Sequence, residues 1–237
     1  MFREIKKKRL ILENRKPYKQ EIAVYISELN ALDWIYSSIR LDGLGVSKEN
    51  ILRIIKGEFV IECSIDEHLQ VRNYCDAIKV AEDMTEMSIE LSAAYIFKLY
   101  QALAKPASLS YRRSNPVLRQ IDHIPPHFNE IEEQMEILIQ GLKTEDIDLN
   151  PVMKAAIVHN KFIEIYPFEK HSESMARTAM QYELIRNGFP PIMLQMSDQE
   201  YNRAIMNYLK TEDSTPLYDI LLRGVFNKLE ILLQLTA

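Results

Sequence analysis

The segment from Ala155 to Ile192 constrains the fold of this chain more than any other part. It begins as an apolar helix that is predicted to end at Ile165, where Tyr166-Pro167-Phe168 follows. Proline ends such a helix because it lacks a backbone N–H and clashes with the preceding turn. After a polar loop, a second helix is predicted to run as far as Gly188, because glycine adopts the left-handed conformation that ends helices. The segment therefore predicts two helices joined by a short loop.

The rest of the chain has the pattern of a mainly helical protein. Of its 237 residues, 47% are hydrophobic and only 6 are glycine, and long stretches carry apolar residues at helical spacing. Two short strands, 108–111 and 117–121, are expected to form a hairpin because Asn115-Pro116 is a turn signal. We therefore predict an all-α fold with one small β-hairpin. Helices are expected at residues 19–41, 47–55, 67–84, 88–104, 129–143, 151–165, 174–187, after the capping box that begins at Ser197, and at 216–235.

Charge and cysteine content exclude several classes of function. The net charge of −5 gives no reason to expect a nucleic-acid partner. Two cysteines, Cys63 and Cys75, do not make a disulfide framework, and no run approaches the roughly 18 apolar residues of a membrane span. We expect a soluble cytoplasmic protein with no membrane partner. The basic N-terminus is expected to be a frayed, solvated arm (Arg3, Lys6, Lys7, Lys8, Arg9).

Several short motifs occur in an order that closely resembles the Fic family. Residues Tyr166 to Arg177 read Tyr-Pro-Phe-Glu-Lys-His-Ser-Glu-Ser-Met-Ala-Arg, where the family has His-Pro-Phe-x-Asp/Glu-Gly-Asn-Gly-Arg-x-x-Arg. Upstream, Ser38 and Gly43 fit the family's inhibitory helix, Ser/Thr-x-x-x-Glu-Gly, and Asp42 replaces its glutamate. The segment with Tyr111-Arg112, Val117 and His123-Ile124-Pro125-Pro126 resembles the family's flap hairpin and the stretch that follows it.

This resemblance covers about residues 20 to 210 and implies an architecture. We expect a Fic-fold helical bundle with a small β-hairpin flap. Its parts would be an N-terminal arm at 1–18, an inhibitory-helix region at 19–66 and a Fic-like core with C-terminal helices at 67–237, all in one compact unit.

The resemblance also implies a reaction, the transfer of AMP from ATP to a hydroxyl of a protein target, for which this loop is poorly suited. The family's general base is the first His of the motif, and here Tyr166 carries a phenol with a reference pKa of about 10. Lys170 stands at the position of the Mg²⁺ carboxylate and would repel the metal. His171, Ser172 and Glu173 replace the Gly-Asn-Gly anion cradle, and Glu173 would itself occupy the start of a helix where phosphate binds.

The retained residues are expected to act structurally. The first motif arginine is Ser174, and the second is kept as Arg177, which we expect to pair with Asp42; two unrelated solvated charges are the alternative. Pro167 ends the helix, and Phe168 is expected to anchor the loop in the core. No metal site is assigned.

Three functions stay open at this stage. The sequence favours a degenerate Fic protein without AMP transfer, a pseudoenzyme that binds a protein or peptide segment at the flap near Tyr111 and Val117. No cofactor is then expected, and ATP with Mg²⁺ would bind only if activity remained. The second is an enzyme with altered chemistry that uses Lys170, His171 and Arg177 on a phosphate-bearing ligand. The third is a self-associating homo-oligomer that joins through its apolar C-terminal helix.

Overall fold

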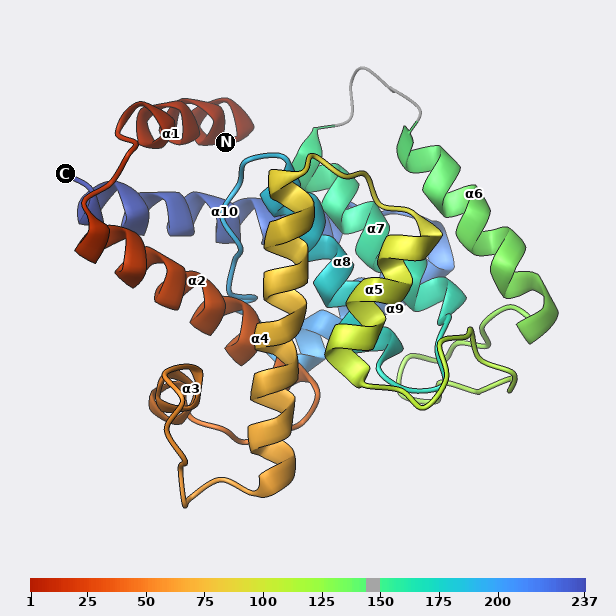
Figure 1. Ribbon diagram of the computed structural model, residues 1–237. Helices are drawn as coiled ribbons and strands as arrows, with labels where there is room; N and C mark the ends of the chain where they lie inside the picture. Colours follow the sequence, from red (N-terminus) through yellow and green to blue (C-terminus); the bar gives the residue numbers. More distant parts are fainter. Residues whose placement is uncertain (144–149) are drawn as a thin grey trace.

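The computed structural model describes residues 1–143 and 150–237 and is all-helical in these ranges (Figure 1). Among the described residues, no helix combines the length and apolarity needed to cross a bilayer. The division of the chain at residues 18 and 66 stays a prediction. The elements are α1 (Phe2–Asn14), α2 (Gln20–Leu41), α3 (Lys48–Ile55), α4 (Ile65–Glu86), α5 (Ala93–Ala104), the 3-10 helix η1 (Phe128–Glu130), α6 (Ile131–Lys143), α7 (Pro151–Ile165), α8 (Ser172–Arg186), α9 (Asp198–Thr211) and α10 (Thr215–Leu235).

Side-chain caps fix where several helices begin, and the sequence predicts those of α7 and α9. The Asn150 side chain accepts a hydrogen bond from the Met153 amide at 3.0 Å, with proline at the first helical position. Ser197 forms a capping box at the start of α9, and Ser64 forms one at the start of α4. These caps satisfy N–H groups that have no partner inside the helix. The starts of α7 and α9 are therefore set locally.

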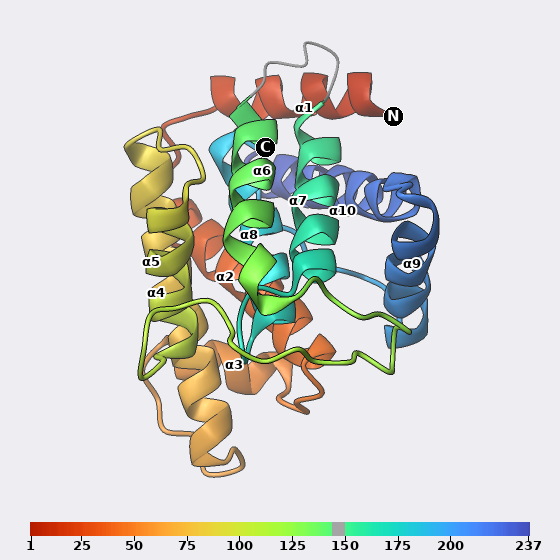
Figure 2. The same ribbon diagram turned by 90° about the vertical axis from the view of Figure 1, so that its right-hand side faces the viewer.

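Helix α8 lies in the middle of the bundle. It packs along α7 and is also contacted by α2, α4 and α5, an arrangement that Figures 1 and 2 show from two sides. Ser172 and every residue from Ser174 to Leu184 are buried, so this helix is enclosed on every face. The loop from Tyr166 to His171 joins α7 to α8, and because both helices are held in the core, the two ends of this loop are fixed.

The N-terminus is a helix rather than the frayed arm that the sequence suggested. Ile5 and Leu12 of α1 are buried, and α1 packs on α10, above which it lies in Figure 2. The Arg15 guanidinium donates to the Leu233 carbonyl at 2.6 Å near the end of α10. This packing is hard to predict from the sequence, because only two buried apolar residues, seven positions apart, stand among many basic ones. The apolar face of α10 is thereby covered by α1 and α7 (Leu217, Leu221, Val225, Leu229, Leu232).

The predicted hairpin flap does not form. Residues 105–127 contain no strand, and only an isolated antiparallel bridge joins Leu118 to His123, whose N–H and C=O groups pair at 2.8 and 3.2 Å. The backbone that follows the first predicted strand, 108–111, is bound elsewhere. The Arg112 amide donates to the Pro167 carbonyl at 2.9 Å, and the next two amides donate to the Glu169 carboxylate. The segment is therefore a loop fastened to the end of α7; it is called the flap loop below.

Candidate functional site

A cavity of about 600 Å³ lies where the end of α2 meets the loop between α7 and α8 and the start of α9. Gly43, with φ +82, turns the chain away from the end of α2, so that the last turn of this helix reaches the cavity. The α7–α8 loop and the end of α2 are brought together as the sequence predicts. Residues of both segments line the cavity (Asp42, Gly43, Tyr166, His171, Glu173, Ser174).

The Asp42 carboxylate is held by three donors. The Ser174 hydroxyl lies 3.1 Å from both carboxylate oxygens, and the Tyr74 hydroxyl donates to one of them at 3.1 Å. The third donor is the guanidinium of Arg177, which forms the predicted ion pair. Burial raises the pKa of Tyr74, and Asp42 raises it further, so this phenol stays a donor. An internal carboxylate thus occupies a site built for an anion.

Arg177 is completely buried and continues this cluster inward. Burial alone would lower the pKa of Arg177, but the Asp42 carboxylate outweighs it and holds that pKa well above the ordinary value. A second guanidinium nitrogen donates to the Tyr201 hydroxyl at 3.4 Å, and that hydroxyl lies 2.7 Å from Nε2 of His159. Burial lowers the pKa of His159 to about 3, so the imidazole is neutral and accepts. The chain from Asp42 to His159 connects four helices.

Tyr166 stands at the end of α7 in the left-handed conformation, with φ +48. Its side chain lines the cavity. Burial raises the pKa of this phenol to about 12, and the Glu173 carboxylate contributes to the rise. At neutral pH the group is therefore a hydrogen-bond donor and has no capacity to take a proton as a base.

The remaining loop residues do not converge. His171 and Glu173 line the cavity, whereas Lys170 is exposed and is not part of the lining. Burial lowers the pKa of His171 and raises that of Glu173, so it disfavours the charged form of each side chain. The trio Lys170, His171 and Arg177 is not assembled around one space, because Arg177 is already engaged by Asp42. The residues present also do not fit Mg²⁺: Lys170 offers no oxygen ligand, and the described residues hold no group of three or more His, Cys, Asp or Glu side chains that could bind a metal ion.

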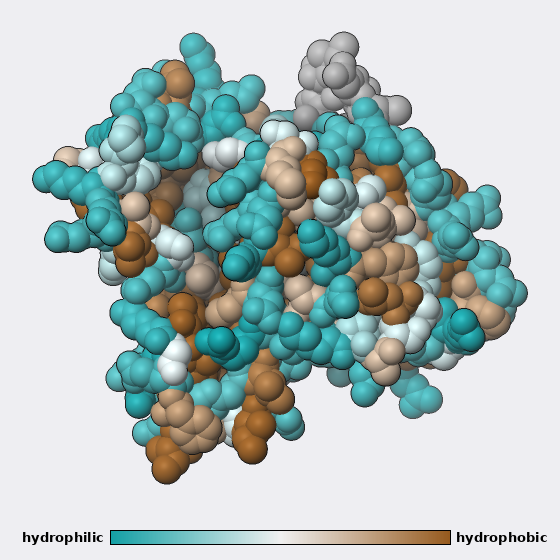
Figure 3. All heavy atoms as spheres, viewed as in Figure 1, coloured by the Kyte–Doolittle hydropathy of each residue, from teal (hydrophilic) through white to brown (hydrophobic). Residues whose placement is uncertain are grey.

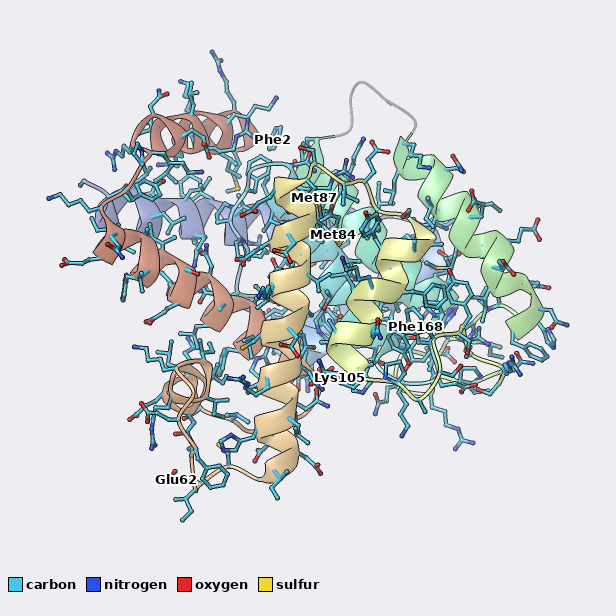
Figure 4. All side chains as sticks on the ribbon, viewed as in Figure 1. Phe2, Glu62, Met84, Met87, Lys105 and Phe168 are labelled. Atoms are coloured by element: carbon cyan, nitrogen blue, oxygen red, sulfur yellow. The ribbon has the colours of Figure 1, made fainter. Side chains whose placement is uncertain are left out.

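The loop is anchored by Phe168 and Ser172. Phe168 is fully buried and stacks on Tyr100 of α5, with ring centroids 3.8 Å apart, and Figure 4 shows it beside that helix. The Ser172 hydroxyl accepts from the Phe168 amide at 2.8 Å and donates to the Phe168 carbonyl at 2.9 Å. Pro167 is buried as well. The side chains of Phe168 and Ser172 therefore hold the loop in place without a bound ligand.

Two residues whose roles the sequence did not predict fasten the flap loop to this site. Buried Arg112 donates to the carbonyls of Tyr166 at 2.7 Å and of Pro126 at 2.5 Å. Glu169 accepts from the Ser114 hydroxyl at 2.7 Å, and the pKa of this carboxyl is lowered by that bond and by the Arg113 amide. No spacing in the sequence marks either role, since Tyr166 lies 54 residues from Arg112 and Ser114 lies 55 residues from Glu169.

The flap residues take different places. Tyr111 is half-buried and packs against Phe97 at a centroid distance of 4.8 Å, so it belongs to the anchor of the loop. Val117 is 60% exposed and faces solvent. Ser38 of the α2 motif is buried, and its carbonyl accepts from the Asp42 amide at 3.0 Å.

Comparison with known proteins agrees with this geometry. Residues 90–184 match the Fic/DOC family. A Fic domain containing signaling protein from Bacteroides thetaiotaomicron has a similar structure, with a TM-score of 0.83 and 19% identity over 98% of this chain and 97% of that one. Fic-1 from C. elegans aligns with a TM-score of 0.81 and 18% identity over 98% of this chain and 70% of that one.

This chain is a Fic family protein. The protein adenylyltransferase Fic of Nematostella vectensis is 27% identical over 188 residues, which are 77% of this chain and 44% of that protein. The enzyme of the same name from Drosophila melanogaster is 26% identical over 165 residues, 68% of this chain and 33% of that protein. The chain thus spans less than half the length of these two relatives.

Proposed function

We propose that this Fic protein is a pseudoenzyme, which does not transfer AMP and acts by binding an extended segment of another protein at the flap loop. The observation that carries the first half is the Asp42 cluster. Arg177, Ser174 and Tyr74 all direct donors to one internal carboxylate, so the buried guanidinium behind the cavity is already neutralised. An incoming phosphate would have to displace Asp42 before it reached that guanidinium.

The chemistry of the loop supports the same conclusion. Loss of a general base typically costs about 10²–10⁴-fold in rate, and Tyr166, with a pKa of about 12, cannot replace it. Glu173 lies in the first turn of α8 and places a carboxylate at the helix end where a phosphate would be attracted. Lys170 offers no oxygen ligand for Mg²⁺. Tyr166 thus opposes proton transfer, Glu173 opposes the binding of ATP, and Lys170 opposes the binding of Mg²⁺.

Calorimetry and a transfer assay test the loss of activity. ATP, with and without Mg²⁺, is titrated into the wild type and into Asp42→Gly, and label transfer from ATP to protein is followed in both. We expect no transfer from either protein, and at most a gain of ATP binding in Asp42→Gly. Transfer by the wild type would refute the proposal. A variant with the family's loop residues restored is the positive control (Tyr166→His, Lys170→Asp, His171→Gly, Ser172→Asn, Glu173→Gly, Ser174→Arg).

Exposed apolar side chains on the flap loop support the second half. Leu109, Val117 and Ile124 are exposed on a loop that Arg112 and Glu169 hold in place. A fixed loop loses little conformational freedom when a partner docks. IbpAFic2, a Fic protein whose structure has been determined covalently tethered to Cdc42, aligns with this chain at a TM-score of 0.55 and 15% identity. A protein target near this loop is therefore the partner that we propose, in the cytoplasm, where the free Cys63 and Cys75 would stay reduced.

An array of extended peptides tests the docking surface. The wild type, Val117→Asp and Ile61→Asp are compared on the same array. Ile61 is the matched control because it is an exposed apolar residue in the segment between α3 and α4, away from the flap loop. We expect Val117→Asp to lose the peptides that the wild type binds and Ile61→Asp to keep them. Equal binding by all three proteins would exclude the flap loop as the docking site.

A further inference from the structure

A second cavity, of about 520 Å³, lies among α1, α2, α4 and α10 and shares no lining residue with the first. Figure 3 shows a recess between α1 and α4 in this part of the surface, with hydrophobic residues inside it and hydrophilic residues around it. Apolar side chains from four elements form much of its lining (Ile26, Ile78, Phe189, Leu229, Leu232). The function proposed above makes no use of this cavity.

Two polar side chains of α2 line the same cavity without a partner. Trp34 is only 1% exposed, and its indole N–H has no hydrogen-bond acceptor. The amide oxygen of Asn30, one helical turn earlier, is also buried and has no donor. Buried polar groups are nearly always paired in folded proteins, because an unpaired one has lost its water without compensation. One unpaired donor and one unpaired acceptor therefore stand on the same face of one helix.

The charged residues around the cavity are not balanced. Two cations line the cavity: Lys16 pairs with Glu13 at 2.9 Å, whereas Arg9 donates to the neutral Asn187 carbonyl at 2.6 Å and keeps its charge. Glu82 and Glu86 lie one turn apart on α4 and form no ion pair with any described residue. Burial raises the pKa of Glu82, and the carboxylates of Asp83 and Glu86 raise it further. Both side chains are exposed, and this wall of the cavity carries two carboxyl groups that form no ion pair among the described residues.

We propose that this cavity binds a primary amine that carries an apolar body and a neighbouring amide, the arrangement found at the free N-terminus of a peptide. The ammonium group meets Glu82 and Glu86, and the apolar body covers the hydrophobic lining. The ligand's carbonyl accepts from the Trp34 indole N–H, and its amide N–H donates to the Asn30 oxygen. Each unmatched group of the cavity is thereby given a complementary group in one small molecule.

Tryptophan fluorescence tests this site directly, because Trp34 is the only tryptophan of the chain. Leucinamide is titrated into the full chain while Trp34 emission is recorded, and calorimetry is run in parallel. N-acetyl-leucinamide is the matched control, since acetylation removes the charge and keeps the apolar body and the amide. Leucyl-glycinamide is the third probe: tighter binding than leucinamide indicates a peptide N-terminus, and equal binding indicates a small free amine.

We expect leucinamide to change the emission saturably and N-acetyl-leucinamide to bind at least about tenfold more weakly. Glu82→Gln should weaken leucinamide binding by about tenfold, whereas Asp83→Asn should not, because it removes a neighbouring charge of α4 that is outside the lining. Failure of leucinamide to bind by either method would overturn the proposal. Equal binding of the acetylated probe, or unchanged binding by Glu82→Gln, would overturn it as well.

Discussion

Replacement of Asp42 by alanine should destabilise the protein more than the loss of any surface ion pair. The carboxylate accepts from Arg177, Ser174 and Tyr74, and the guanidinium of Arg177 is completely buried. Removing one partner of a buried ion pair typically costs about 3–5 kcal/mol, because the other charge is left uncompensated. The side chain of Asp42 is 20% exposed, so water can reach part of the space that alanine would leave. We therefore expect a loss of about 2–4 kcal/mol in the free energy of unfolding.

Urea and thermal denaturation measure this loss. For a chain of this size, each kcal/mol lowers Tm by about 2–4 °C, so Asp42→Ala should melt roughly 5–15 °C below the wild type. Asp198→Ala is the matched control, because Asp198 also pairs with an arginine, Arg40, at 2.8 Å, but is 66% exposed. Exposed pairs of this kind contribute about 0–1 kcal/mol.

An added oxyanion provides a second readout of the same reasoning. If Arg177, Ser174 and Tyr74 form an anion site that Asp42 occupies, sulfate should stabilise Asp42→Ala more than it stabilises the wild type, since a ligand stabilises the state that binds it. The reasoning is refuted if Asp42→Ala is no less stable than Asp198→Ala. It is also refuted if sulfate stabilises both proteins equally.

Three further changes probe the surroundings of the site. Burial lowers the pKa of His159 to about 3, so between that value and about 6.5 the unfolded state binds more protons than the folded state, and the free energy of unfolding falls on acidification by up to about 1.4 kcal/mol per pH unit. His159→Gln should flatten this pH dependence in urea denaturation between about pH 5 and 7, and an unchanged slope would contradict the argument. Arg112→Lys should cost about 2–3 kcal/mol in thermal denaturation, because an ammonium cannot span the carbonyls that the guanidinium reaches; a wild-type Tm would count against this. Phe168→Ala should cost about 3–5 kcal/mol by the same measurement, because it removes a buried ring stacked on Tyr100, and a loss below about 1 kcal/mol would show that the loop is not anchored there.

The sequence predicted those features that depend on local signals. The cap at Asn150 and the box at Ser197 lie within a few residues of the groups they satisfy, so α7 and α9 begin where expected. The pair of Asp42 with Arg177 joins two distant segments; it was expected from the resemblance to the Fic family, and the structure contains it. The two caps needed no knowledge of which distant segments pack together, whereas this ion pair did.

The sequence failed where a distant partner decides the local structure. The pattern of α1 shows few apolar residues, and its helix is held because Ile5 and Leu12 find α10. The two predicted strands, 108–111 and 117–121, would have to pair with each other, and Glu169 instead binds the amides of Arg113 and Ser114 in the segment between them. In both cases the residue that decides the local structure lies outside the segment.

The buried guanidinium of Arg112 has a mechanical consequence. It connects the flap loop, through the carbonyls of Ser114 and Pro126, to the last turn of α7, through the carbonyl of Tyr166. A protein that pulls on the exposed side of this loop therefore exerts force on the peptide group that orients the Tyr166 ring. The flap loop and the cavity are therefore mechanically coupled. A partner bound to the flap loop would shift Tyr166 at the cavity without entering the cavity itself.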